Sequence, residues 1–472
     1  MALTKNAMLV EQAIKRRSGV AELTKSMVFA MDAMSGGFFD SVSRADSVTK
    51  VRRTWEPFAH ALSIINDHIT VREDEIHAAS AAYDEIANRL VNELDWPRDA
   101  ISVHVQGSAS TKTLIRSPDR SKFDIDAICE VDISKVQARD PMAFFEAIGA
   151  ALDGLDAEPK KRCWKINFNG KPFYVECTPS VPLETIPPSQ QATSHLKLAE
   201  PEFATTALAV VDTPTKKWKT SNPAGIRNWV DRVAARTIVK QLILDSVTKS
   251  ASANIQPVAT QSVEVEETLR VAIRLFKRHR DMRVYRNEID GEFQPISIIL
   301  VTLVTTCFDG LADLIDDGSL QAFAHPVDAL IAIAELLPLM ILHDPVLGYY
   351  LQNPTVVGEN FAERWNEDDG DRAQTFDAWC GLLRADLERI AALTDQKEIE
   401  TESIPCDARA GSRASRSGFS IDSGALTTSL SNLNKFTTDV ALVGTISPIA
   451  FVNFTPPHDA SSLDTLFGTL AL

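Results

Sequence analysis

Two aspartates, Asp124 and Asp126, stand at alternate positions of an otherwise largely apolar stretch, Phe123–Val131. Side chains two residues apart in a β-strand point to the same face of a sheet, so the pattern predicts a strand that carries two carboxylates on one face and buries the other. Carboxylates held this close repel one another unless a cation neutralises them. Mg²⁺ prefers such oxygen ligands and commonly lies between one or two carboxylates and the phosphates of a substrate. The stretch therefore predicts a magnesium-dependent phosphate chemistry.

A glycine–serine pair, Gly107 and Ser108, follows a short segment, Ile101–Val105, that we predict to be another strand. We expect the backbone N–H of Gly107 and the hydroxyl of Ser108 to hold the phosphates of a nucleotide. Alone, Ser108 could simply cap a helix, and an Asp-x-Asp strand could be a solvated sheet edge. The two features in this order, about sixteen residues apart, predict a site for nucleotidyl transfer.

A third acid is expected from segment 173–179, where Glu176 is the one acidic residue of a strand-like run. Asn-Gly at 169–170, between alternating apolar residues, predicts a hairpin that would bring this strand into the sheet of Asp124 and Asp126. Three acids can hold two Mg²⁺ ions, or Mn²⁺. One ion activates an attacking hydroxyl and the other neutralises the leaving phosphates. The alternative is that Glu176 is a surface carboxylate near a strand end.

The segment 269–280 is the densest basic stretch of the chain and has helical periodicity. We expect basic residues of this stretch to meet a triphosphate, and His279 to lie at the surface. The alternative is a solvated helix face. Lys112 and Arg116 are further candidates for phosphate contacts. The cations that cluster on this helix are Arg270, Arg274, Lys277 and Arg278.

Strands and helices alternate between about 100 and 185, and helical periodicity dominates from 226 to 393, so we predict an α+β fold with a mixed sheet in one lobe and a second, helical lobe. The helices expected in the second lobe are 226–248, 263–283, 295–308 and 327–342, with further helical segments at 362–365 and 375–393. We divide the chain into an N-terminal helix (1–46), a nucleotidyltransferase lobe that begins with a long spine helix (47–222), a helical lobe (223–396), and a linker with a C-terminal extension (397–472).

The 472 residues include 48 Lys and Arg against 64 Asp and Glu, which gives a formal net charge of −16. So acidic a chain is not attracted as a whole to long nucleic acid, and this favours free nucleotides as substrates. The apolar run 296–306 is too short for a membrane span and is expected to be a buried helix. The six cysteines lack the spacing of a zinc site, and the start of the chain lacks a signal-peptide hydrophobic region. We therefore expect a cytoplasmic protein.

The Gly-Ser…Asp-x-Asp core resembles that of the nucleotidyltransferase superfamily that includes DNA polymerase β, poly(A) polymerase and oligoadenylate synthase. Three further stretches resemble a narrower family, the bacterial cGAS/DncV-like nucleotidyltransferases (CD-NTases). They are the Asn-Pro-x-Gly…Trp of 218–229, the basic helix 269–280, and the Asn-Pro…Glu-Asn…Trp of 353–365. The resemblance covers about residues 50–393 and implies a polymerase β-like lobe.

In that family the lysine at the position of Lys277 contacts the donor triphosphate, and Ser297 resembles a serine that follows it. The third acid is usually Asp, whereas this chain has Glu176. The chain also lacks a Cys/His insertion like the zinc module of the animal DNA sensor, so activation by double-stranded DNA is not implied.

The resemblance implies an enzyme that joins nucleoside triphosphates, ATP among them, into a cyclic di- or trinucleotide second messenger for anti-phage (CBASS-type) signalling. Its partners would be an activator, or a protein conjugated to its C-terminus. Three alternatives stay open. The first is a template-independent enzyme that makes linear oligonucleotides or extends RNA, the second is a catalytically idle nucleotide-binding scaffold, and the third is an antitoxin-like module that modifies a partner protein.

Overall fold

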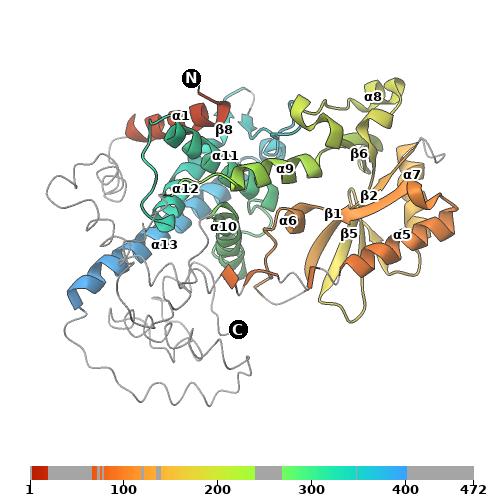
Figure 1. Ribbon diagram of the computed structural model, residues 1–472, viewed down its shortest axis with the longest axis horizontal. Helices are drawn as coiled ribbons and strands as arrows, with labels where there is room; N and C mark the ends of the chain where they lie inside the picture. The colour runs from red at the N-terminus through yellow and green to blue at the C-terminus, as the bar shows by residue number, and fades with distance from the viewer. Residues whose placement is uncertain are drawn as a thin grey trace, which may run out of the picture.

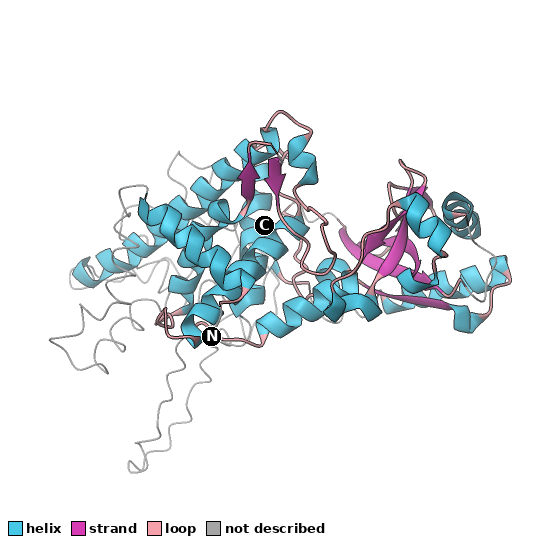
Figure 2. Cartoon of the chain, turned by 90° about the horizontal axis from the view of Figure 1, so that it is seen from above, coloured by secondary structure: helices cyan, strands magenta, loops and turns pink. Residues whose placement is uncertain are grey.

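The computed structural model describes residues 3–19, 66–67, 69–71, 75–76, 79–118, 122–133, 140–239, 268–346 and 348–400. They form two lobes that lie side by side, one around a β-sheet and one almost entirely of helices (Figure 1). In the view from above, the larger sheet and the helical lobe occupy opposite ends of the molecule (Figure 2). The predicted α+β class, with a mixed sheet in one lobe and a helical second lobe, is confirmed.

Helices occur in both lobes and strands mainly in one. The helices are α1 (Lys5–Gly19), α5 (Ser80–Leu94), α6 (Gly107–Ser110), α7 (Pro141–Ala151), α8 (Pro188–Ser194), α9 (Pro223–Ala234), α10 (Thr268–Tyr285), α11 (Ser297–Asp316), α12 (Pro326–Met340) and α13 (Asp371–Glu400). Short 3₁₀ turns are η1 (Arg98–Ala100), η2 (Leu183–Thr185), η3 (Pro201–Thr206) and η5 (Glu363–Asn366). The strands are β1 (Ile101–Val105), β2 (Phe123–Val131), β3 (Ala157–Pro159), β4 (Trp164–Asn167), β5 (Phe173–Pro182), β6 (Leu208–Asp212), β7 (Lys217–Ser221), β8 (Leu342–Asp344) and β9 (Gly348–Tyr350).

The large sheet is mixed. Its strands follow the order β1-β2-β5-β4-β3, and the hairpin β6–β7 extends it from β5. The pair β2–β5 is parallel and the other pairs are antiparallel. The predicted hairpin with the Asn-Gly turn is confirmed as β4–β5. One face of the sheet packs against α5 and α7, where the alternate residues of β2, from Phe123 to Val131, are buried. The opposite face is left for the polar residues of the same strands.

A second, separate core fills the helical lobe. Its buried residues come mainly from α1 and from α9 to α13. The apolar run expected to be a buried helix lies in α11, and 72% of the most apolar part of this helix is buried inside the protein. The apolar character of α11 is therefore explained by its place in the core of this lobe.

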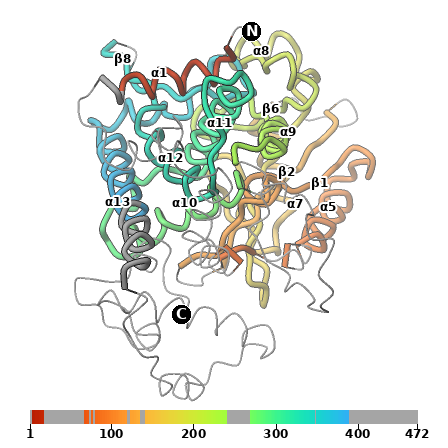
Figure 3. Tube along the Cα trace, turned by 60° about the vertical axis from the view of Figure 1, so that its left-hand side comes forward, coloured from red at the N-terminus to blue at the C-terminus, as the bar shows by residue number. Residues whose placement is uncertain are grey.

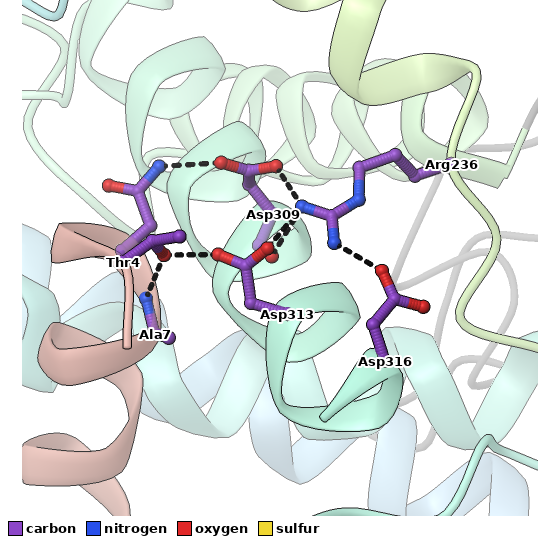
Figure 4. Close-up of polar contacts among 7 residues, drawn as sticks. Thr4, Ala7, Arg236, Asp309, Asp313 and Asp316 are labelled. Carbon is purple, nitrogen blue, oxygen red and sulfur yellow. Dashed lines mark hydrogen bonds and ion pairs between the residues drawn. The ribbon is translucent and has the colours of Figure 1, made fainter. Parts of the chain in front are cut away.

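The N-terminal helix α1 belongs to the helical lobe, where it crosses α11 and α12 (Figure 3). It comes close to α11 at Gly310, where an added Cβ would lie 2.5 Å from the backbone oxygen of Asn6. Asp309, Asp313 and Asp316 share one face of α11, and Arg236, just after α9, binds all three (Figure 4). Asn6 of α1 donates to Asp309 over 2.8 Å. One guanidinium thus neutralises three like charges that would otherwise repel, and α1 shares their oxygens.

Two predicted helices are wrong in the residues that the structure describes. The long spine helix 47–95 is not continuous, because Thr70 forms a bridge with Ile115 and α5 begins only at Ser80. The helix 226–248 ends at Ala234, and Val239 then pairs with Phe323. Each break contains three consecutive β-branched residues, which lose side-chain freedom in a helix and favour extended backbone. Residues 401–472, with most of the predicted linker and C-terminal extension, lie outside the described part.

We expect Gly310→Ala to destabilise the protein by roughly 1–3 kcal/mol, because the new methyl group has to push α1 away from α11. The matched control is Gly381→Ala in α13, where an added Cβ meets nothing within 4 Å. An exposed helical Gly→Ala change should stabilise by about 0.5–1 kcal/mol. Thermal unfolding of both variants measures the difference, and limited proteolysis reports whether α1 has come loose. Equal stability of the two variants would contradict the close packing.

Candidate active site

Asp124, Asp126 and Glu176 lie on one face of the sheet. In the parallel pair β2–β5, Asp126 is the direct neighbour of Glu176, and Asp124 is the neighbour of Tyr174. Adjacent strands are about 4.8 Å apart, and residues in register point to the same face. The third acid predicted from the sequence therefore lies beside the aspartate pair, and the hairpin β4–β5 is what brings it there.

The turn at Gly107 rests directly on Asp126. Gly107 has a φ of +62°, in the left-handed region. A Cβ at this position would lie 1.9 Å from Oδ2 of Asp126, so only glycine leaves room for the carboxylate. The backbone N–H of Gln106 donates to the carbonyl of Asp126 over 2.9 Å, which fixes the turn to β2. The Gly-Ser turn and the Asp-x-Asp strand thus form one unit.

Asp124 and Glu176 lie close enough to Asp126 to change its pKa. Burial, followed by the charges of Asp124 and Glu176, raises the pKa of Asp126 to about 7. Burial also raises the pKa of Tyr174 to about 12, and all three acids add to this effect. A positive charge at this face would relieve the repulsion between the carboxylates.

The acids suit a cation that arrives with a nucleotide. Within the described ranges, no three His, Cys, Asp or Glu side chains already converge as a complete set of metal ligands. Mg²⁺ is commonly bound through one or two carboxylates together with phosphate oxygens and water, so a complete protein cage is not required. The neighbouring carboxylates, and a turn fitted closely to one of them, are the features that such an ion needs.

Lys277 reaches this site from the helical lobe. Its ammonium donates to the hydroxyl of Ser108 and to the carbonyl of Thr113, each over 2.9 Å. The side chain is 3% exposed, and burial, then the charge of Arg280, lower its pKa to about 8. No carboxylate among the described residues forms an ion pair with it. A buried ammonium that has only neutral partners is a good site for an anion.

Three arginines of α10 donate hydrogen bonds to backbone carbonyls of the sheet lobe. Arg274 donates to the carbonyl of Lys112 over 2.7 Å, Arg270 donates to that of Thr111 over 3.3 Å, and Arg278 donates to that of Arg116 over 3.4 Å. These three arginines therefore hold the loop 108–116 of the sheet lobe against α10. We call this set of hydrogen bonds the carbonyl clamp. The alternative of a solvated helix face is wrong for Arg274, Lys277 and Arg278, because these three side chains are buried.

The structure also corrects the prediction for His279. His279 is completely buried, where Trp379 donates to its Nδ1 over 2.9 Å. Burial lowers the pKa of His279 to about 4, so the ring stays neutral beside Asp386. Arg116 forms an ion pair with Glu75 and is therefore engaged within the protein. The buried His279 fixes one side of α10 in the helical core, which turns Lys277 toward the sheet.

A cavity of about 400 Å³ opens between the two lobes at this point. Its lining includes Asp124 and the phosphate-binding candidates Ser108 and Lys277. Ser297, at the start of α11, also lines it. The predicted residues Gly107, Asp126 and Glu176 adjoin it through the contacts described above. Sequence analysis did not single out the remaining polar side chains of the lining: Ser117, Lys122, Tyr174, Arg280, Asp281, Tyr285 and Gln294.

Comparisons with known proteins agree with the motifs. No protein-family model matches the chain. A c-di-GMP synthase of Roseivirga ehrenbergii is 23% identical over 299 residues, which are 61% of this chain and 67% of that protein. The solved structures that are similar include the CD-NTase CdnG of Bradyrhizobium diazoefficiens in complex with GTP, with a TM-score of 0.45, 17% identity, and coverage of 72% of this chain and 92% of that one. DncV of Vibrio cholerae bound to GTP has a TM-score of 0.36, 16% identity, and coverage of 75% and 82%.

The chain is similar to the cGAS/DncV-like nucleotidyltransferases, as its motifs predicted. In this CD-NTase-like chain, two of the motifs lie at the joint between the lobes. Asn222 caps α9 by accepting from the N–H of Gly225 over 2.9 Å, and it donates to the carbonyl of Phe203. Asn353 binds Glu359 over 2.6 Å and shapes a loop that pairs with the sheet lobe through Ala199 and Val356. These motifs therefore hold the joint, and the Gly-Ser and Asp-x-Asp motifs form the site.

We expect Gly107→Ala to abolish binding of a magnesium–nucleotide complex, because the methyl group and the carboxylate of Asp126 cannot occupy the same space. The matched control is Gly170→Ala in the β4–β5 turn. Gly170 also has a positive φ, of +72°, but nothing lies within 4 Å of an added Cβ. The control should lose only roughly 1 kcal/mol of stability through backbone strain and should still bind. Isothermal titration with a non-hydrolysable ATP or GTP analogue compares the two variants, and similar binding by both would contradict the cradle.

Proposed function

We propose that this protein is a Mg²⁺-dependent nucleotidyltransferase that joins nucleoside triphosphates into a cyclic oligonucleotide messenger, in the manner of a CBASS-type signalling enzyme. The observation that carries the proposal is that a carboxylate of the acidic group and a buried ammonium line the same cavity. Asp124 of β2 and Lys277 both line it, and Asp126 and Glu176 lie beside Asp124 on the same face of the sheet. The similarity to a c-di-GMP synthase supports the same class of product.

The chain's own residues would divide the work between the two lobes. Lys277 and Ser297 would hold the β/γ end of the donor triphosphate, and the Gly107–Ser108 turn would hold its other phosphates. Asp124, Asp126 and Glu176 would hold Mg²⁺, or Mn²⁺. The bound cations supply activation of the attacking hydroxyl and neutralisation of the leaving pyrophosphate. Phosphoryl-type transfer depends mainly on positioning and electrostatics, so this set needs no histidine base.

Replacing the two aspartates tests the assignment directly. We expect Asp124→Asn with Asp126→Asn to lower product formation from radiolabelled ATP, GTP, CTP and UTP at least about 10³-fold, because the metal site is lost. The matched control is Glu130→Gln, an acid on the same face of β2 but farther along the strand, next to Ser180 in the register. The control should keep near wild-type activity, and activity that survives in the double variant would contradict the proposal.

The product decides between the ring and the alternatives left open by the sequence. A cyclic product resists phosphatase and end-specific exonucleases, whereas a linear oligonucleotide is degraded by one of them. Mass spectrometry after incubation with all four triphosphates, first with Mg²⁺ and then with Mn²⁺, identifies the bases and the ring size. Nucleotide binding without release of pyrophosphate under any of these conditions would instead identify an idle scaffold.

Lys277 predicts a pH dependence of nucleotide binding. Its pKa is lowered to about 8 in the nucleotide-free protein, and the protonated form is the one that attracts a triphosphate. The binding-competent fraction therefore falls as pH rises through 8, and the apparent Kd should rise roughly eightfold between pH 7.5 and pH 9. In Lys277→Arg the charge persists across this range, so its slope should be nearly flat whatever its absolute affinity. Titration calorimetry with a non-hydrolysable analogue compares the slopes, and equal slopes would contradict the role of Lys277.

A further inference from the structure

The carboxylate of Glu176 accepts a hydrogen bond from a thiol. Cys163 comes directly before β4, and its thiol donates to Oε2 of Glu176 over 3.6 Å. Cys163 is buried, at 9% exposure.

The basic residue next to Glu176 in the sheet contacts a different side chain. Lys165 is the register partner of Glu176 on β4, and its ammonium lies 4.3 Å from the ring centre of Tyr174. Among the described residues, Cys163 is the one side chain that donates a hydrogen bond to Glu176. An S–H group is a weak donor, so it can orient a carboxylate without neutralising the charge that a cation would need.

We propose that Cys163 is a positioning residue for Glu176, and that its thiol fixes one carboxylate oxygen so that the other is available to the cation that accompanies the nucleotide. The proposal rests on the proposed function. Glutamate has one more rotatable bond than aspartate and so more freedom to lose when it is fixed in place.

A double-mutant cycle tests the proposal. Cys163→Ala and Cys163→Ser are made with Glu176 intact and with Glu176→Asp. Binding of Mn²⁺ in the presence of a non-hydrolysable ATP or GTP analogue is measured by electron paramagnetic resonance, which does not depend on turnover. The Mg²⁺ concentration for half-maximal product formation is measured in parallel.

With Glu176 intact, we expect Cys163→Ala to weaken Mn²⁺ binding roughly tenfold, at the lower end of what the loss of a hydrogen bond to a metal ligand causes. The Mg²⁺ requirement should rise by a similar factor, and the serine variant should recover most of the loss through its O–H donor. With Glu176→Asp, removal of the thiol should change metal binding less than twofold, because the shorter carboxylate no longer reaches it.

The matched control is Cys307→Ala in α11. Cys307 is also buried, but burial alone raises the pKa of its thiol, with no carboxylate involved. This variant should unfold at a lower temperature and bind Mn²⁺ as the wild type does. An equal effect of Cys163→Ala in both backgrounds, or a loss of thermal stability with unchanged metal binding, overturns the positioning role. Metal binding that depends on Cys163 in a protein that forms no product overturns the synthase function alone.

Discussion

The carbonyl clamp between α10 and the loop 108–116 is the interaction on which the site depends. Three arginines and Lys277 cross from the helical lobe to the loop that follows Gly107. Each of these four side chains donates to a carbonyl of the loop, so the clamp fixes the loop against α10, and Arg270 also forms an ion pair with Asp231. The lobes are joined at a second place by α9 and the pairing of Ala199 with Val356. The cavity between them is therefore defined on both sides before any ligand enters.

Opposite charges line that cavity or adjoin it, and each is costly by itself. The pKa of Asp126 is raised toward neutrality by burial and by its acidic neighbours, and that of Lys277 is lowered toward neutrality by burial and Arg280. Titratable groups disturbed in this way are concentrated at functional sites, although structural networks can also disturb them. A triphosphate with its cations would satisfy both surfaces together, since the phosphates would meet the ammonium and the cations would meet the carboxylates.

Much of the site followed from local patterns. The strand with Asp124 and Asp126, the hairpin that carries Glu176, and the helix that carries Lys277 were all predictable, because alternation and helical periodicity report which face each side chain occupies. The hairpin β6–β7 was missed, since its short strands lie in a segment without a clear alternating pattern. The breaks at 69–71 and 237–239 were missed because helical periodicity was extended across β-branched triplets that tertiary bridges then fixed as extended chain.

The sequence by itself determined the residues of the site and the faces on which they lie, because both follow from the period of a strand or a helix. Only the tertiary structure decided their partners. Periodicity cannot tell that three arginines would bind loop carbonyls while Lys277 alone met the hydroxyl of Ser108, or that His279 would be buried. It also cannot show the thiol of Cys163 beside Glu176, since that contact depends on how the β4–β5 hairpin folds. Such contacts join residues distant in the chain, and they are set by the packing of the two lobes rather than by any local preference.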